Sequence, residues 1–207
     1  MNWRPMTDPI DAILRPPTEA SALALEVARR WSSPELTNHS LRSWAWARAL
    51  GDSLRLDYDP ELLFVAAMLH DLGVTAAFDS HTLPFETAGG AAAWVFAAGA
   101  GWPEARRTRV LEVIERHMWV SVDPEQDAEG YLLEAATSLD VAGADPQLWD
   151  PAVLAAVTAR VPRLDFSARF ADAIHDQAIR KPECAAARLD RSGRIPAGAA
   201  AWTTLAP

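Results

Sequence analysis

Apolar residues recur along most of the chain at intervals of three and four positions, the spacing of helices that bury one face. Val110, Val113, Ile114 and His117, for example, fall on one such face. No convincing segment alternates apolar and polar residues, so β-strands are not expected. The pattern predicts eight helices, over residues 18–31, 38–50, 60–71, 85–98, 103–118, about 130–141, 151–159 and 165–181.

Short Asp-Pro and Ser-Pro pairs indicate where helices begin, because Asp or Ser suits the N-cap and Pro suits the first helical position. These pairs are Asp8-Pro9, Ser33-Pro34, Asp59-Pro60, Asp123-Pro124, Asp145-Pro146 and Asp150-Pro151. Gly73 is expected to end the helix that begins at Pro60. The fold class is therefore all-α. We expect a single bundle of roughly eight helices over residues 1–184, with an N-terminal helix, and an Ala-, Pro- and Gly-rich tail over residues 185–207.

The composition narrows the classes of partner. The 207 residues are 50% hydrophobic and carry a formal charge of −9, which argues against nucleic acid and against an anionic membrane surface. The single cysteine excludes an intramolecular disulfide and suits a reducing cytosol, and no apolar run approaches the length of a membrane span. A cytoplasmic protein with a small-molecule partner is the expectation. A homo-oligomer is compatible with the sequence. Trp3, Trp149 and Trp202 suit either of two roles: they mark the interface of an oligomer if exposed, or they dock the chain termini on the body.

Ionisable residues lie on the apolar faces of four predicted helices. His39 shares a face with Trp46 and Leu50, and His117 continues the face of Val110. Asp140 follows Leu133, Ala136 and Thr137 in the same manner, and the His70-Asp71 pair ends the apolar run of residues 62–69. A lone inward histidine is most often a hydrogen-bonded core residue. Several together are costly to bury unless one partner binds them all, and a divalent metal does so.

The order His39, His70-Asp71, Asp140 resembles the signature of the HD domain of metal-dependent phosphohydrolases. The wider text is similar to the cyanamide hydratase-like branch of HD proteins, from about residue 34 to residue 182. The segments that carry this resemblance are NHSLRSWAWARAL, AAMLHDLGVT, PFETAGG, VIERHMWV, ATSLDVAG and VPRLDFSARFADAIHDQAIRKP.

The resemblance implies an HD fold that holds a metal with His39, His70, Asp71 and Asp140. Zinc is usual for this branch, while Fe, Mn, Ni or Co occur across the superfamily. Asp71, His117 and Glu86 are the expected catalytic residues, although Glu86 near a helix start also suits a purely structural role. His175, in a second His-Asp pair, is expected to play no part. Substrate-binding residues are expected among Asn38, Arg42, Trp46, Thr75, His81 and Trp119.

Two reactions fit such a centre. In one, metal-activated water adds to the carbon of a small nitrile-like substrate, as in a cyanamide hydratase. In the other, an HD phosphohydrolase cleaves a nucleotide or phosphate ester, which calls for basic residues around the phosphate. Few basic residues lie near the motifs, so we favour the hydratase or hydrolase with a small, neutral or weakly charged substrate. A diiron oxygenase that uses His81, Glu86 and His117, and a non-catalytic ligand-binding HD protein, are the remaining alternatives.

Overall fold

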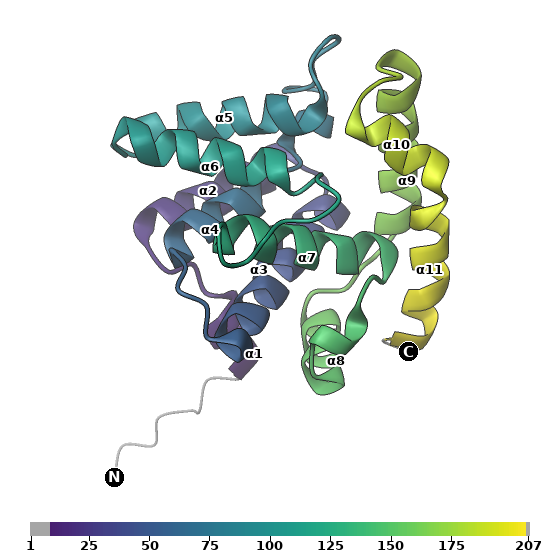
Figure 1. Cartoon of the computed structure of the whole chain (residues 1–207), viewed down its shortest axis with the longest axis horizontal. Coiled ribbons are helices and arrows are strands. Elements are labelled where there is room, and N and C mark those ends of the chain that lie inside the picture. Colours follow the sequence, from purple (N-terminus) through teal and green to yellow (C-terminus); the bar gives the residue numbers. More distant parts are fainter. Residues whose placement is uncertain (1–8, 206–207) are drawn as a thin grey trace.

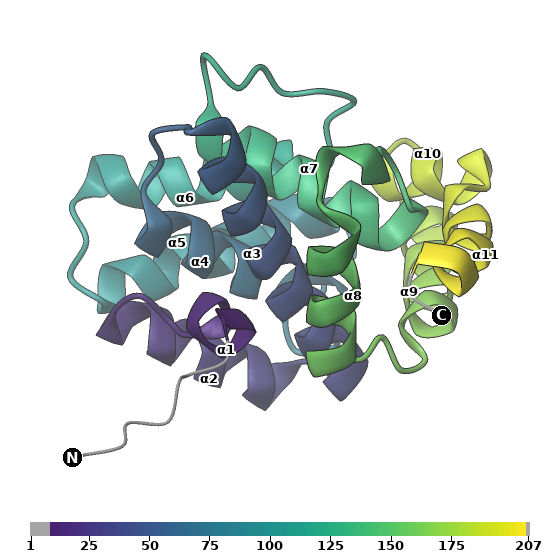
Figure 2. The same ribbon diagram turned by 90° about the horizontal axis from the view of Figure 1, so that it is seen from below.

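Helices alone build the part of the chain that the structure, a computed structural model, describes, residues 9–205 (Figures 1 and 2). The α-helices are α1 (Pro9–Leu14), α2 (Glu19–Trp31), α3 (Pro34–Leu54), α4 (Pro60–Leu69), α5 (Phe85–Gly99), α6 (Glu104–Arg116), α7 (Ala128–Ala142), α8 (Pro151–Arg160), α9 (Phe166–Arg180), α10 (Ala185–Ser192) and α11 (Arg194–Leu205). Two short 3₁₀ turns, η1 (Leu72–Val74) and η2 (Pro146–Leu148), complete the list. The predicted all-α class is confirmed, and the eight predicted helices correspond to α2–α9.

Several helices begin where the Pro pairs predict. Ser33 and Asp59 cap α3 and α4, and the Asp59 carboxylate accepts hydrogen bonds of 3.0 Å from the amides of Glu61 and Leu62. The signal at Asp145 yields only η2, and Pro124 lies in a turn. Caps satisfy the amides of a first helical turn, but an apolar face must follow before the helix continues.

The helix that carries the His-Asp pair lies at the centre of the bundle. Every residue of α4 from Leu62 to Leu69 is buried, and α2, α3, α6 and α7 pack around it. This explains its continuous apolar run, because a helix surrounded by other helices has no solvent face. Gly73 does not end α4, contrary to the prediction. The helix stops at Leu69, and Gly73 lies inside η1, against the backbone of Phe85.

The predicted tail is helical. Helices α10 and α11 gather with α9 at one end of the molecule (Figure 1), where α10 packs on α9 and α11 packs on α7 and α9. The Trp202 ring stacks on Trp46 with 5.2 Å between centroids, and the Trp149 indole donates a 2.9 Å hydrogen bond to the Trp46 carbonyl. Both Trp149 and Trp202 are 5% exposed, so of the two expected roles the structure favours docking on the body over an exposed interface. Trp3 lies outside the described residues.

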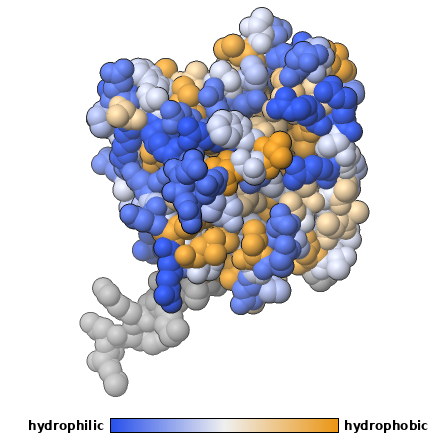
Figure 3. Space-filling model, in the orientation of Figure 1, coloured by the Kyte–Doolittle hydropathy of each residue, from blue (hydrophilic) through white to orange (hydrophobic). Residues whose placement is uncertain are grey.

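Polar side chains cover most of the face drawn in Figure 3, and apolar ones appear there in small separate groups. Within residues 9–205 no helix combines the length and apolar character that crossing a bilayer requires.

Candidate metal centre

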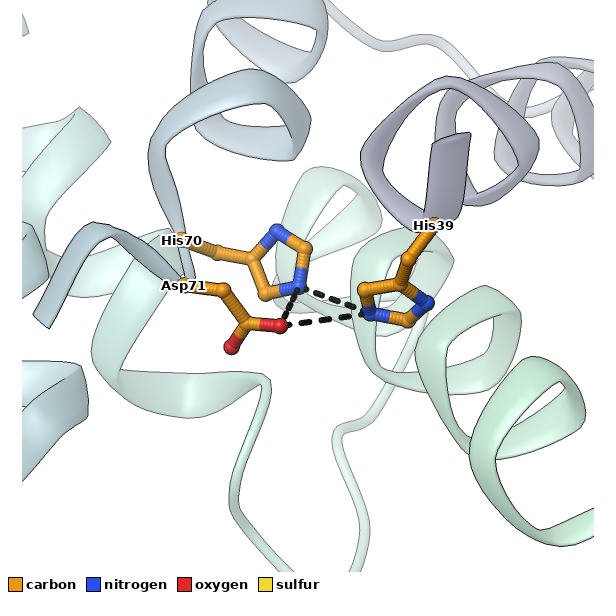
Figure 4. Close-up of side chains that lie close together, drawn as sticks. All are labelled: His39, His70 and Asp71. Atoms are coloured by element: carbon orange, nitrogen blue, oxygen red, sulfur yellow. Dashed lines mark hydrogen bonds and ion pairs between the residues drawn. The ribbon is translucent and has the colours of Figure 1, made fainter. Parts of the chain in front are cut away.

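His70 and Asp71 leave the C-terminal end of α4 and point toward α3 (Figure 4). The His70 Nδ1–H donates to the carbonyl oxygen of Ala67 at 2.8 Å, one turn back on α4. A carbonyl only accepts, so this bond fixes the tautomer and leaves a lone pair on the His70 Nε2. The end of a fully buried helix thus presents one imidazole nitrogen and one carboxylate to the neighbouring helix.

His39 meets this pair from α3. Its Nδ1 donates to the Asp140 Oδ2 at 2.6 Å, which directs its Nε2 toward α4. That Nε2 lies 3.1 Å from the His70 Nε2 and 3.4 Å from the Asp71 Oδ2. The His70 Nε2 is 3.2 Å from the same oxygen. Three ligand atoms, one from each residue, therefore lie within 4.8 Å of one another in a buried setting.

This arrangement fits a divalent cation. Both Nδ1 atoms donate to acceptors, so two imidazole lone pairs face each other beside a carboxylate. Both oxygens of Asp71 are buried and make no hydrogen bond with the described residues. Burial raises the pKa of Asp71, but the neighbouring His70 outweighs it and lowers that pKa to about 2, so the carboxylate is ionised. A metal with nitrogen and oxygen ligands satisfies all three groups.

Asp140 lies behind His39. Its carboxylate accepts from the Arg42 Nη2 at 2.6 Å and from the Arg163 guanidinium. Burial raises the pKa of Asp140, but Arg42 and the hydrogen bond from His39 outweigh it and hold that pKa well below its usual range. The structure therefore brings three of the four predicted ligands together and places Asp140 where it orients one of them.

Aromatic rings pack against the centre. Phe166 of α9 stacks on His39 with 4.4 Å between centroids, and Phe170 follows one turn later at 6.0 Å.

His117, at the end of α6, stands edge-on to His70 at 4.9 Å between ring centroids. Its Nδ1 donates to the Ile114 carbonyl, and its Nε2 lies 3.9 Å from the Asp71 Oδ1. Burial and the neighbouring His70 lower the pKa of His117 to about 3, so its ring is neutral at pH 7.

A cavity of about 40 Å³ opens at the three ligands. Its remaining walls are mostly apolar, with His117, Thr137, Ser138 and Arg194 as the polar members. The lining residues are His39, His70, Asp71, His117, Met118, Thr137, Ser138, Val141, Ala142, Phe170, Leu189 and Arg194. We call this space the inner cavity.

Other predicted site residues lie elsewhere. Arg42 is fully buried, and its guanidinium is engaged by Asp140 and by the Pro162 carbonyl. Asn38 also donates to the Pro162 carbonyl, at 2.9 Å. Trp46 is fully buried in the core. None of these three side chains lines the inner cavity: Arg42 and Trp46 are packed between helices, and the partly exposed Asn38 lines a separate hollow.

The other three residues predicted to bind substrate do not line the inner cavity. Thr75 lines a separate hollow beside Phe166 and donates to the Leu72 carbonyl at 2.7 Å. His81 is exposed in the loop before α5. Trp119 is 56% exposed and lines the hollow outside the inner cavity.

Glu86 lies in the first turn of α5 and is 8% exposed. Its Oε2 is buried without a hydrogen-bond partner among the described residues, and burial raises its pKa. It does not line the inner cavity, so a direct role in catalysis stays a prediction.

Sequence reasoning missed two groups of site residues. Arg163, Phe166 and Phe170 lie in the segment VPRLDFSARFADAIHDQAIRKP, which served only as part of the resemblance, and no site role was assigned to them. Leu189 and Arg194 belong to the tail, for which the resemblance implied nothing.

Comparisons with known proteins agree with this geometry. A family model described as HD domain matches residues 36–141, which include all four predicted ligands. Two curated relatives are the cyanamide hydratases DDI2 and DDI3 of Saccharomyces cerevisiae. Each is 30% identical to this chain over 177 residues, which cover 83% of this chain and 78% of the relative.

Proposed function

Because the chain belongs to the HD-domain family and is cyanamide hydratase-like, we propose that it adds water to a small nitrile-like substrate at a divalent ion, most simply zinc. The chain is an enzyme of the metal-dependent hydrolase and hydratase class. In the proposed reaction the elements of water add across a carbon–nitrogen triple bond, and an amide or urea-like product forms.

The size of the inner cavity is the observation that carries this proposal. A buried water needs roughly 10–15 Å³ of such space, so the 40 Å³ of the inner cavity accept a head group of a few atoms. A phosphate ester at the same ligands would need cations close by for its oxygens. Of the described arginines near the ligands, Arg42 and Arg163 are both engaged by Asp140, which leaves Arg194 as the single arginine in the lining of the inner cavity.

We assign His39, His70 and Asp71 as ligands of the ion. Zinc suits this set, because catalytic zinc sites commonly use three nitrogen and oxygen ligands and keep one position open. Asp140 holds the His39 tautomer in this structure, and its place as the fourth ligand stays a prediction. When bound, the ion supplies Lewis-acid activation of water at neutral pH.

Two residues of the inner cavity, Asp71 and His117, would move the proton. The Asp71 Oδ1 is the carboxylate oxygen nearest to the His117 Nε2, at 3.9 Å. Asp71 takes the proton from the attacking water, and His117 passes it to the substrate nitrogen, which becomes basic as the triple bond opens. The low pKa of His117 favours release of the proton once it has been accepted.

The test combines metal analysis with an activity assay. The protein is purified without added metal, its metals are measured, and urea formation from cyanamide is followed for wild type, His70→Ala and His175→Ala. We expect about one zinc and activity in wild type and His175→Ala, because the His175 ring is 62% exposed and does not line the inner cavity. His70→Ala should lose both metal and activity.

Three other outcomes would contradict the proposal. Cleavage of phosphate esters without hydration of nitriles would favour the phosphohydrolase. About two irons per chain would favour dioxygen chemistry. A metal-free native protein would favour a non-catalytic ligand-binding role.

A further inference from the structure

The inner cavity opens to the surface between the end of α6 and the tail helices. A hollow of about 250 Å³ adjoins it, which we call the mouth. The mouth and the inner cavity share part of their walls, namely His117, Met118, Ser138, Leu189 and Arg194. A substrate whose head reaches the metal ligands therefore has its other end in the mouth.

Two guanidinium groups reach the mouth from the tail. Arg194, the first residue of α11, lines both the inner cavity and the mouth, and Arg188 of α10 lines the mouth. Both side chains are exposed. Within residues 9–205, neither forms an ion pair with a carboxylate.

The hydrogen bonds that Arg188 and Arg194 make with the rest of the protein are long. Arg194 approaches the Ser138 hydroxyl at 3.5 Å, and Arg188 approaches the Glu183 carbonyl at 3.4 Å. Among residues 9–205 other arginines, such as Arg191, also lack an ion pair, so Arg188 and Arg194 are set apart by their position in the lining of the mouth. Guanidinium groups with free N–H donors bind carboxylates and phosphates well, often through two parallel hydrogen bonds.

Burial raises the pKa of Glu134 and the charge of Arg194 opposes that shift, so these two groups interact. Glu134 of α7 accepts a 2.9 Å hydrogen bond from Ser138. It lines a different hollow, with Tyr131 and Asp145, and it does not line the mouth. Arg194 borders both hollows, whereas Arg188 belongs to the mouth alone. Arg194 therefore places a positive charge where the mouth meets the inner cavity, and Arg188 adds a second one within the mouth.

We infer that the substrate carries an anionic group, a carboxylate or a phosphonate-like group, which Arg194 and Arg188 hold in the mouth while its small reactive head enters the inner cavity. This inference rests on the proposed function and refines it, because it makes the tail the element that selects the substrate. The apolar walls between the two ends, including Met118 and Leu189, suit a short carbon spacer.

The experiment compares nitriles of similar size and different charge. Cyanoacetate, cyanomethylphosphonate and the neutral cyanoacetamide are assayed with the metal-loaded wild type and with Arg194→Ala, Arg194→Lys and Arg188→Ala/Arg194→Ala. Arg191→Ala is the matched control: Arg191 is an exposed α10 residue that does not line the mouth, and its loss lowers the net charge by the same amount.

We expect wild type to prefer an anionic nitrile over cyanoacetamide in kcat/KM. Arg194→Ala should reduce that preference at least tenfold, the double variant should reduce it further, Arg194→Lys should restore part of it, and Arg191→Ala should leave it within twofold of wild type. A larger effect on cyanoacetate than on the phosphonate would identify the anion as a carboxylate. Equal preference in wild type and Arg194→Ala would overturn the inference.

Failure of the proposed function would be recognised separately, because wild type would then hydrate none of the nitriles. In that case calorimetry with cyanoacetate and cyanoacetamide decides. Binding of the anion alone, weakened at least tenfold by Arg194→Ala, would support the anion site. Equal affinity of both proteins for cyanoacetate would overturn it.

Discussion

The Nε2 atoms of His39 and His70 lie 3.1 Å apart. The Nδ1–H of His39 donates to Asp140, and the Nδ1–H of His70 donates to the Ala67 carbonyl. No proton is available for a hydrogen bond between them while both rings are neutral. Two lone pairs held face to face in a buried site repel each other, and a cation placed between them and Asp71 removes that repulsion.

Removal of the ion should therefore destabilise the folded protein. An ion present at about 100 times its dissociation constant stabilises the fold by about 2.7 kcal/mol, which corresponds to roughly 5–10 °C in a domain of this size. We expect a strong chelator to lower the Tm of wild type and of His175→Ala by that amount. His39→Ala should have a low Tm that the chelator does not change. A wild-type Tm insensitive to the chelator would contradict the metal assignment.

Substitution Asp140→Asn should be strongly destabilising. Arg42 is fully buried and Arg163 lies largely inside the fold, and both depend on the Asp140 charge. Removal of one partner from a buried ion pair costs about 3–5 kcal/mol, because it leaves an uncompensated charge. Urea unfolding with a chelator present measures this loss apart from metal binding. Asp57→Asn, at an exposed position, should change the free energy of unfolding by less than about 0.5 kcal/mol. A loss below about 1 kcal/mol in Asp140→Asn would mean that water compensates the arginines.

The stability of the fold should also depend on pH through Asp127, a residue outside the metal centre. Asp127 caps α7 and accepts hydrogen bonds from Arg109 and Arg116. Burial raises the pKa of Asp127, but these two arginines outweigh it, so its pKa is lower in the folded chain than in the unfolded one. The ionised carboxylate therefore contributes stability above the unfolded pKa of about 3.9, and that contribution disappears as the pH falls through the folded pKa.

Asp127→Asn tests this contribution, because Asn caps a helix about as well as Asp and only the charge is lost. We expect the variant to be about 2 kcal/mol less stable than wild type at pH 7, as for hydrogen bonds to charged groups. The two free energies of unfolding should converge between pH 4 and the most acidic values that still permit folding. A difference that stays constant with pH would show that packing, not charge, accounts for the loss.

The burial of the site residues could be predicted from the sequence, because helical periodicity is a local property. His39, His70, Asp71 and Asp140 are all at most 2% exposed. His39 and Asp140 were assigned to buried faces from helical periodicity, and His70 and Asp71 from the apolar run of residues 62–69 that they end. The helix starts at Pro34 and Pro60 were also readable, since N-caps depend on adjacent residues only.

What the sequence could not predict is contact between distant segments. Arg163 reaches Asp140 across 23 positions, and Arg194 meets Ser138 across 56. No spacing rule links such pairs, because their approach depends on how whole helices pack. From its Ala, Pro and Gly content, residues 185–207 were predicted to be a tail and not helices. These small residues instead let α11 lie close to α7. A Cβ at Gly198 would stand 2.2 Å from the Val141 carbonyl oxygen.

The role of Gly73 gives the last prediction. A Cβ at this position would lie 2.0 Å from the Phe85 carbonyl oxygen and 2.8 Å from its carbonyl carbon. Both atoms are backbone, so the clash cannot be relieved by rotating a side chain. The Phe85 ring in turn contacts His117 with 5.7 Å between centroids. We expect Gly73→Ala to cost about 3 kcal/mol, the upper end of the usual range for overpacking, and to reduce metal content together with activity.

Gly99→Ala is the matched control for this substitution. Gly99 is the last residue of α5, and a Cβ there meets no atom within 4 Å. Alanine is the better helix former, by roughly 0.5–1 kcal/mol, so this variant should be as stable as wild type or slightly more stable. Urea unfolding and metal analysis on both variants distinguish a specific contact from a general intolerance of added methyl groups. If Gly73→Ala matches Gly99→Ala in both measurements, then η1 does not rest on α5, and the close approach that positions His70 and Asp71 beside His117 is not required.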